Sequence, residues 1–181
     1  MKKLVSILIL CVVLCAGVFA STTSTVSAAV DPYSIQFFTM KEDGEKETIN
    51  SKYAVGGSLR YDWNVWKGLS VGAEVNSTSY FMKETTNFTD IAFLGKVGYT
   101  CEFSSPFAVF GALKGGIDIQ IYDHEASPVG EFAAEVGAKY QINDMFDVFF
   151  SIDNTFGFPR HDGANFFEYR LTPYLGAGFT F

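Results

Sequence analysis

The chain contains few residues of the types that stabilise small secreted domains or bind metals. It has three cysteines and two histidines in 181 residues. Cys11 and Cys15 lie in an N-terminal apolar run, so Cys101 is alone in the rest of the chain, and one thiol cannot form an internal disulfide. Two histidines without a third ligand make a poor zinc site. We therefore expect no disulfide framework, no metal and no cofactor.

Basic residues are also scarce. The chain has 13 Lys and Arg against 20 Asp and Glu, and its formal net charge is −7. Nucleic-acid binding depends on clustered basic residues that neutralise phosphates. We therefore expect no nucleic-acid partner.

Long apolar runs are confined to the N-terminus. Lys2 and Lys3 precede an apolar stretch, and the small residues Val18 and Ala20 suit cleavage after position 20. Beyond that point no apolar run approaches the ~18 residues of a membrane-spanning helix. An uncleaved membrane helix is less favoured, because no charged stop-transfer segment follows the apolar stretch.

These features divide the chain into three parts. We interpret residues 1–20 as a cleaved signal peptide, residues 21–30 as a flexible lead-in and residues 31–181 as one domain. A second cleavage position after Ala28 stays open.

The clearest positive pattern lies in residues 167–181. Apolar residues occupy every second position, and small or polar residues occupy the positions between them. A period of two predicts a β-strand with one apolar and one polar face. Pro173 conflicts with this pattern because proline cannot donate to a strand ladder, so we expect a local bulge or a water molecule there.

Similar alternation recurs along the chain and gives eight predicted strands. They cover residues 33–40, 53–63, 69–82, 89–103, 107–122, 129–142, 146–158 and 167–181. The connections alternate between tight turns and longer, more polar loops, which is typical of an up-and-down barrel. We predict an all-β fold, namely an eight-stranded antiparallel up-and-down transmembrane β-barrel that follows a cleaved signal peptide.

The polar face distinguishes a membrane barrel from a soluble one. In a membrane barrel the polar face lines the lumen, whereas in a soluble barrel it faces the solvent. This face combines charges of both signs with glycines and the rings of Phe110, Phe149 and Tyr174, which suits a narrow interior that side chains must fill. Charges there must pair, since burying an unpaired ion costs several kcal/mol. The residues expected to form lumen ion pairs are Arg60, Glu74, Lys96, Lys114, Asp118, Glu131, Glu135, Lys139, Asp153, Glu168 and Arg170.

Hairpin spacing predicts particular partners within this set. The expected pairs are Arg60–Glu74, Glu74–Lys96, Lys114–Glu135 and Asp153–Arg170. Four other charged residues, Asp62, Asp90, Glu102 and Asp147, are interpreted as solvated residues at strand ends. Cys101 falls in the lipid-facing set near the turn side, and we interpret it as a buried small apolar residue.

The chain resembles the small eight-stranded outer-membrane barrels, the group that includes the OmpA transmembrane domain and OmpX. The resemblance rests on the export signal, the eight alternating segments, the short turns and the final Phe181. It implies a bacterial outer-membrane location and folding assisted by periplasmic chaperones and the barrel-assembly machinery. That machinery recognises a terminal aromatic residue and the alternating apolar residues before it, which here are Leu175, Ala177, Phe179 and Phe181.

This reading favours a non-enzymatic role. We expect a monomer in contact with outer-membrane lipid, with a filled polar lumen and outer loops that serve adhesion or recognition of an extracellular ligand. The residues most available to a partner lie in segments 41–52 and 160–165: Lys41, Glu42, Asp43, Glu45, Lys46, Arg160, His161 and Asp162. Plain solvated loops are the simpler interpretation of these segments, and a narrow transport barrel for a small or hydrophobic solute is the alternative function.

An outer-membrane hydrolase is a further class. His124 and His161 have the acidic neighbours Asp123 and Asp162, and Ser127 lies three residues from His124. A nucleophile needs a base within hydrogen-bond reach and a group that orients the base. The three residue types are present, but not in a spacing known from small barrel enzymes, so we assign none of them a catalytic role.

A carboxylate pair is the other catalytic pattern in the sequence. Glu131 and Glu135 share one face of a predicted strand, as the two acids of a glycosidase do. Four residues along a strand separate them by about 13 Å, which is too far for that mechanism. They fit better as lumen ion-pair partners.

A closed membrane barrel can be tested without a structure. We expect the mature chain, refolded in detergent, to migrate differently on a denaturing gel before and after boiling, because a closed barrel resists the detergent until it is heated. A water-soluble product that migrates identically in both lanes would favour the soluble barrel instead.

Overall fold

The structure, a computed structural model, describes residues 23–42, 45–50, 53–81, 88–104, 106–122, 125–158, 160–161 and 164–181. The signal peptide predicted for residues 1–20 lies outside these ranges. The strands are β1 (Ser24–Asp31), β2 (Ile35–Glu42), β3 (Glu45–Asn50), β4 (Tyr53–Trp66), β5 (Leu69–Phe81), β6 (Phe88–Ser104), β7 (Phe107–Tyr122), β8 (Glu125–Gln141), β9 (Phe146–Gly157), β10 (Arg160–His161) and β11 (Ala164–Thr180). No helix among the described residues is both long and apolar enough to cross a membrane.

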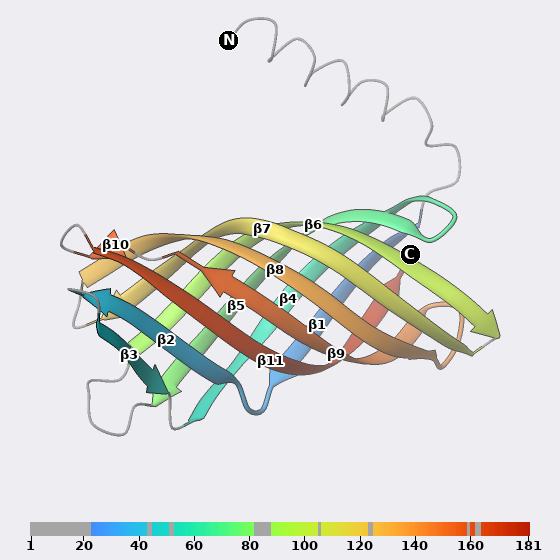
Figure 1. The fold of residues 1–181 in the computed structure, drawn as a ribbon. Helices are drawn as coiled ribbons and strands as arrows, with labels where there is room; N and C mark the ends of the chain where they lie inside the picture. Colours follow the sequence, from blue (N-terminus) through green and yellow to red (C-terminus); the bar gives the residue numbers. More distant parts are fainter. Residues whose placement is uncertain are drawn as a thin grey trace, which may run out of the picture.

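Eight of these strands close a ring. The order is β1-β4-β5-β6-β7-β8-β9-β11, and β1 pairs back onto β11, with every pairing antiparallel. Figure 1 shows the strands strongly tilted, with the short turns at the end near the carboxyl terminus and the loop end opposite. The predicted eight-stranded antiparallel up-and-down barrel is confirmed.

The flexible lead-in predicted for residues 21–30 is wrong from Ser24 onward. These residues form β1, which pairs with β4 on one side and β11 on the other and so closes the ring. Ser24 and Phe181 exchange two backbone hydrogen bonds of 2.9 Å at the turn end. The alternation of valine and alanine with serine and threonine gives little contrast in hydropathy, which is why the sequence pattern missed this strand.

The first barrel strand consists of two pieces, β1 and β2, which both pair with β11. The register pairs Val30–Leu175 and Ile35–Leu171 flank the junction. Four residues separate the pairs in the first strand and three separate them in β11, so the first strand carries a one-residue bulge. Pro173 lies opposite this bulge, where the ladder is already interrupted.

Polar side chains replace the missing ladder bonds at the bulge. The Asp31 carboxylate accepts hydrogen bonds from the backbone N–H of Tyr33, at 3.0 Å, and from the Ser34 hydroxyl. The Ser34 hydroxyl also lies 3.1 Å from the hydroxyl of Thr172 on β11. A proline is tolerated in the closing strand because its neighbour does not depend on a regular ladder there.

The two faces of the wall have the orientation of a membrane barrel. The side chains of Phe150 and Leu175 are 50% and 59% exposed on the outside, whereas Glu135 and Arg170 are 4% and 5% exposed in the lumen. A soluble barrel would have the opposite arrangement.

The turn between β4 and β5 is set by backbone conformation. Lys67 has φ 33° and Gly68 has φ 87°, so two consecutive residues adopt the left-handed region, as in a type I′ hairpin turn. Between β8 and β9, the Asn143 side-chain oxygen accepts hydrogen bonds of 2.9 Å from the N–H groups of Met145 and Phe146. Both connections are tight, as the sequence predicts.

Glycine makes room for the rings in the lumen. A Cβ atom added to Gly176 would lie 2.3 Å from Cζ of Phe149 and 2.6 Å from the carbonyl oxygen of Ala28. Gly137 has the same relation to Phe110, whose Cζ would lie 2.5 Å away. The rings therefore fill the interior only because the facing wall has no side chain.

We expect Gly176→Ala to lower the free energy of unfolding by about 1–3 kcal/mol, because the new methyl group overpacks the Phe149 ring. The matched control is Gly115→Ala on the outer wall, where the nearest atom to an added Cβ is 3.8 Å away. The control should change stability by less than about 0.5 kcal/mol. Urea unfolding in detergent micelles measures both, and equal effects would contradict the packing argument.

Candidate functional site: the filled lumen

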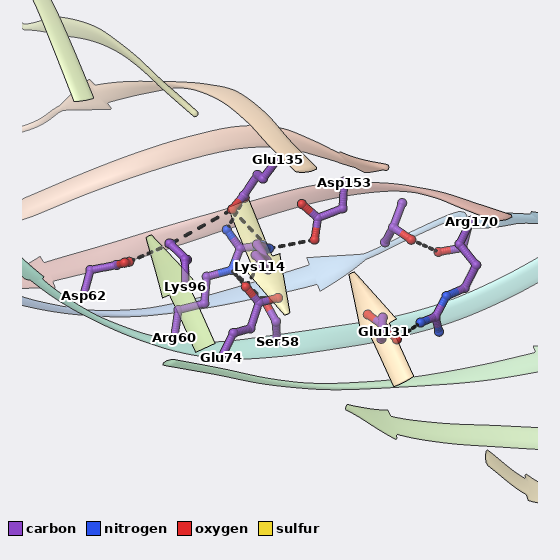
Figure 2. A network of polar contacts seen from close by, with 12 residues as sticks. Ser58, Arg60, Asp62, Glu74, Lys96, Lys114, Glu131, Glu135, Asp153 and Arg170 are labelled. Carbon is purple, nitrogen blue, oxygen red and sulfur yellow. Dashed lines mark hydrogen bonds and ion pairs between the residues drawn. The ribbon is translucent and has the colours of Figure 1, made fainter. Parts of the chain in front are cut away.

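The charged residues of the polar face meet inside the barrel in two groups. The first, here called the Lys114 network, lies midway along the barrel. The second, the Arg170 network, lies nearer the loop end. Figure 2 shows the Lys114 network around Lys114, Arg60 and Glu135, with Arg170 and Glu131 further along the axis. A layer of rings lies on the turn-end side of Arg60, beside Lys96 and Asp62.

This ring layer consists of Phe110, Phe149 and Tyr174. Phe149 and Tyr174 are buried, and the rings of Phe110 and Phe149 pack edge to face with centroids 6.1 Å apart. The guanidinium carbon of Arg60 lies 5.0 Å from the Phe149 ring centre and 4.7 Å from that of Tyr174. These cation–π contacts join the ring layer to the charges above it.

Lys114 is the centre of the first network. Its Nζ atom lies 2.6 Å from Glu74, 2.7 Å from Asp153 and 3.1 Å from Glu135, three carboxylates on three other strands. Arg60 approaches Glu135 to 2.6 Å and Glu74 to 3.4 Å. The structure therefore contains the Arg60–Glu74 and Lys114–Glu135 pairs that hairpin spacing predicts.

Lys96 extends the network toward the turn end. Its Nζ atom lies 2.8 Å from Asp62 and 4.0 Å from Glu135. The sequence paired it with Glu74 instead and interpreted Asp62 as a solvated strand-end residue, and both statements are wrong. Tilted strands place Lys96 level with Gly72 in the ladder, two residues nearer the turn end than Glu74.

Arg170 is the centre of the second network. It forms ion pairs with Asp90 and Glu131, and its guanidinium nitrogens lie 3.3 Å from Glu168 and 3.5 Å from Asp118. The prediction that Asp153 faces Arg170 is wrong, since Asp153 binds Lys114.

Asp90 is fully buried, so its interpretation as a solvated strand-end residue is wrong as well. Besides its ion pair with Arg170, it accepts a 3.0 Å hydrogen bond from the backbone N–H of Thr78.

Neutral donors complete the Arg170 network. Glu168 accepts hydrogen bonds from the side-chain amides of Gln36 on β2 and, at 2.6 Å, Gln120 on β7. The Tyr80 hydroxyl lies 3.0 Å from Arg170, and its ring stacks on Phe88 with centroids 4.5 Å apart. The sequence offered no signal for the glutamines, because neutral residues on a polar face are compatible with either solvent or lumen.

The two networks differ in charge balance. The Lys114 network contains three cations and four carboxylates: Arg60, Lys96, Lys114, Asp62, Glu74, Glu135 and Asp153. The Arg170 network contains one cation and four carboxylates: Arg170, Asp90, Asp118, Glu131 and Glu168. The integrity of the loop-end network therefore depends on a single side chain.

Three remaining charged residues lie toward the turn end. Lys139 and Asp147 are half-buried and line the turn-end mouth of the lumen, so Asp147 is not a freely solvated residue. Glu102 is exposed, as its strand-end position predicts, and Cys101 is a free, exposed cysteine on the outer wall.

The residues expected to form an assembly signal are placed on the outer wall. Leu175, Ala177 and Phe181 are exposed, and the ring of Phe179 lies 5.0 Å from Phe146 and 6.1 Å from Phe181. Their recognition during assembly stays a prediction.

The structure describes only two of the five candidates for hydrolytic chemistry. Asp123, His124 and Asp162 lie outside the described residues, His161 is placed in β10, and Ser127 is exposed on β8. Among the residues that the structure describes, no group of three or more His, Cys, Asp or Glu side chains is arranged to hold a metal ion.

Of the predicted outer-loop contacts, Asp43 and Asp162 lie outside the described residues. The others are placed in short strands rather than loops: Lys41 and Glu42 in β2, Glu45 and Lys46 in β3, and Arg160 and His161 in β10. Charged residues at the tip of a hairpin resemble a loop in sequence, which explains the difference.

Residues 6–181 match the family described as outer membrane protein beta-barrel domain. No curated protein matches the sequence.

Among solved structures, Neisserial surface protein A (NspA) superposes with a TM-score of 0.55 at 10% identity, over 87% of this chain and 95% of that one. Ail of Yersinia pestis, in complex with the heparin analogue sucrose octasulfate, gives 0.49 at 18% identity, over 89% and 99%. The outer membrane protease OmpT of Escherichia coli gives 0.44 at 10% identity, over 90% and 98%. At these identities the likeness concerns the fold alone.

We expect Arg170→Met to lower the free energy of unfolding by about 3–5 kcal/mol at pH 7, because it leaves four carboxylates in the lumen without a cation. At a lower pH the loss should shrink, since protonation of the carboxylates removes their repulsion. Lys67→Met, at an exposed turn, is the matched control and should cost less than about 0.5 kcal/mol. Urea titrations at both pH values measure this, and a loss independent of pH would count against the charge argument.

Proposed function

The chain belongs to the outer membrane protein β-barrel family, and we propose that it is a sealed, non-enzymatic barrel that presents its loop-end hairpins at the cell surface. Membership of this family implies the bacterial outer membrane as the location.

The observation that supports a sealed barrel is the continuous filling of the lumen. Beyond a turn-end cavity lined by Lys96, Asp62 and two of the rings, a solute would meet the rest of the Lys114 network, then the Arg170 network and finally the buried ring of Tyr80. Each network joins side chains from strands on different sides of the barrel, so neither network can be displaced without separating buried ion pairs. Eight strands enclose only enough space for such side chains.

The loop-end hairpins are the part available for recognition. β2 and β3 form a hairpin of six register pairs, from Phe37–Asn50 to Glu42–Glu45, and β10 forms a second, shorter hairpin with β11. Both lie at the loop end in Figure 1. We propose that these hairpins contact an extracellular ligand, while contact with periplasmic chaperones and the assembly machinery, and a monomeric state, stay predictions.

Two alternatives remain distinguishable by experiment. A narrow transport barrel requires the lumen to open, and an outer-membrane hydrolase requires a nucleophile and a base on the outer rim. The filled lumen favours the sealed barrel over transport.

In a planar lipid bilayer we expect the protein to give no steady conductance, because buried ion pairs and rings occupy the lumen. Removing the ring layer alone, with Phe110→Ala, Phe149→Ala and Tyr174→Ala combined, should leave the bilayer sealed, since both ionic networks persist. Combining these changes with Lys114→Ala and Arg170→Ala, which removes the central cation of both networks, should produce measurable ion flow.

The matched control removes three rings from the outer wall by combining Phe93→Ala, Phe132→Ala and Phe150→Ala, and it should not conduct. A large porin in the same bilayer establishes the sensitivity of the measurement. A steady, large conductance of the unmodified protein would defeat the sealed barrel and favour transport.

A further inference from the structure

The turn end of the lumen contains a polar cavity of about 70 Å³. Figure 2 shows Lys96 and Asp62 at the end of the Lys114 network opposite Arg170, and both residues line this cavity. A single water molecule needs roughly 10–15 Å³ by the same measure, so the cavity accommodates about five or six non-hydrogen atoms. That is the size of one small polyatomic ion.

Small residues leave this space open. Ser27, Ser70 and Gly98 line the cavity and are buried, and none of them has a side chain long enough to fill the barrel at this level. A Cβ atom added to Gly98 would already lie 3.1 Å from Oγ of Ser70. Arg60 and the Phe149 ring also line the cavity and belong to the filled part of the lumen beyond it.

The cavity wall contains hydrogen-bond donors that the rest of the described chain does not use. Ser27 and Ser70 are each 7% exposed, and neither hydroxyl has a hydrogen-bond partner among the described residues. Arg60 donates through Nε to Ser58 and through Nη1 to Glu135, which leaves its Nη2 without an acceptor. A buried donor without an acceptor is costly. Several such donors around one space indicate an acceptor from outside the chain.

The charged residues that line the cavity favour an anion. They are three cations, Arg60, Lys96 and Lys139, and two carboxylates, Asp62 and Asp147, so positive charge is in excess by one. Lys139 supplies this excess, because it interacts electrostatically with Asp147 but forms no ion pair within 4 Å with any described residue. The Lys139 ammonium is half-buried, so an anion in the cavity would replace part of its lost contact with water.

Asp147 determines which anion suits the cavity. Its carboxylate lies against the wall at Gly178, where an added Cβ atom would be 2.9 Å from Oδ1 of Asp147, and it borders the same space as the donors. A carboxylate repels a fully deprotonated anion but accepts a hydrogen bond from an anion that retains a proton. Inorganic phosphate has five non-hydrogen atoms and keeps at least one proton at neutral pH, whereas sulfate keeps none. Size and charge therefore both favour phosphate.

We propose that the turn-end cavity binds a single inorganic phosphate ion. Lys139 and Arg60 donate charge-assisted hydrogen bonds to it, the hydroxyls of Ser27 and Ser70 add neutral ones, and Asp147 accepts the proton that the ion retains. The short turns of a membrane barrel face the periplasm, so the ion enters and leaves on that side. The site does not depend on what the loop-end hairpins bind.

Isothermal titration calorimetry of the full folded protein in detergent tests the site, with sodium phosphate, sodium sulfate and glycine as probes. We expect one phosphate ion to bind per barrel, sulfate to bind more weakly and glycine not to bind. Lys139→Met should weaken phosphate binding by roughly 10- to 100-fold, because it removes a charged hydrogen bond. The matched control, Lys67→Met, removes the same charge from an exposed turn at the same end of the barrel. It should weaken binding by less than about twofold, since exposed charges are screened by salt.

Asp147→Asn tests the selection of a protonated anion. The amide can donate to sulfate where the carboxylate repels it, so we expect sulfate to bind this variant at least as tightly as phosphate does. A variant that still prefers phosphate, or that weakens both anions equally, would contradict the role of Asp147. Glycerol 3-phosphate distinguishes the free ion from a phosphate monoester, and tighter binding of the ester than of phosphate would reject the assignment to inorganic phosphate.

Several results would overturn the proposal. If phosphate shows no saturable binding up to about 10 mM, water alone fills the cavity. Equal losses in Lys139→Met and Lys67→Met would mean that surface charge, and not the cavity, attracts the ion. Heat-dependent gel migration verifies folding. If Lys139→Met does not fold, Ser70→Ala takes its place: a loss of about threefold or more in phosphate affinity supports the site, and a smaller loss rejects it.

Discussion

The structure depends on one constraint: the charged side chains inside the narrow barrel must be neutralised by partners of opposite charge. Lys114 satisfies three carboxylates at once, and Arg170 alone opposes four. Because these carboxylates come from different strands, the ion pairs tie opposite sides of the ring together in addition to the backbone ladder. The outer wall can then be almost uniformly apolar, since the charges that the barrel requires are held inside.

The narrowness of the lumen also explains why it contains both glycines and rings. Gly176 and Gly137 have no side chain where Phe149 and Phe110 approach the wall, so the rings fill the area below the ionic networks. Arg60 links the two kinds of filling, because it binds Glu135 on one side and lies over Phe149 and Tyr174 on the other. Packing and charge therefore support each other in the middle of the barrel.

The sequence predicted the barrel and its orientation because alternation of period two is a local property. It predicted Arg60–Glu74, since these residues face each other across one hairpin, but it misplaced Lys96 and paired Asp153 with Arg170. Contacts across a lumen depend on the tilt and stagger of all strands, which no local pattern contains. Ser24–Asp31 was missed for a different reason, because small residues of similar hydropathy give a weak alternation.

Ser24 and Phe181 are joined by two backbone hydrogen bonds, so a short linker could connect them covalently. New termini could then be opened at the connection between β7 and β8. Such a circular permutant would keep every strand pairing of the ring while moving Phe181 to an internal position. It would therefore show whether the predicted recognition by the assembly machinery depends on the position of Phe181 in the chain or only on the closed cylinder.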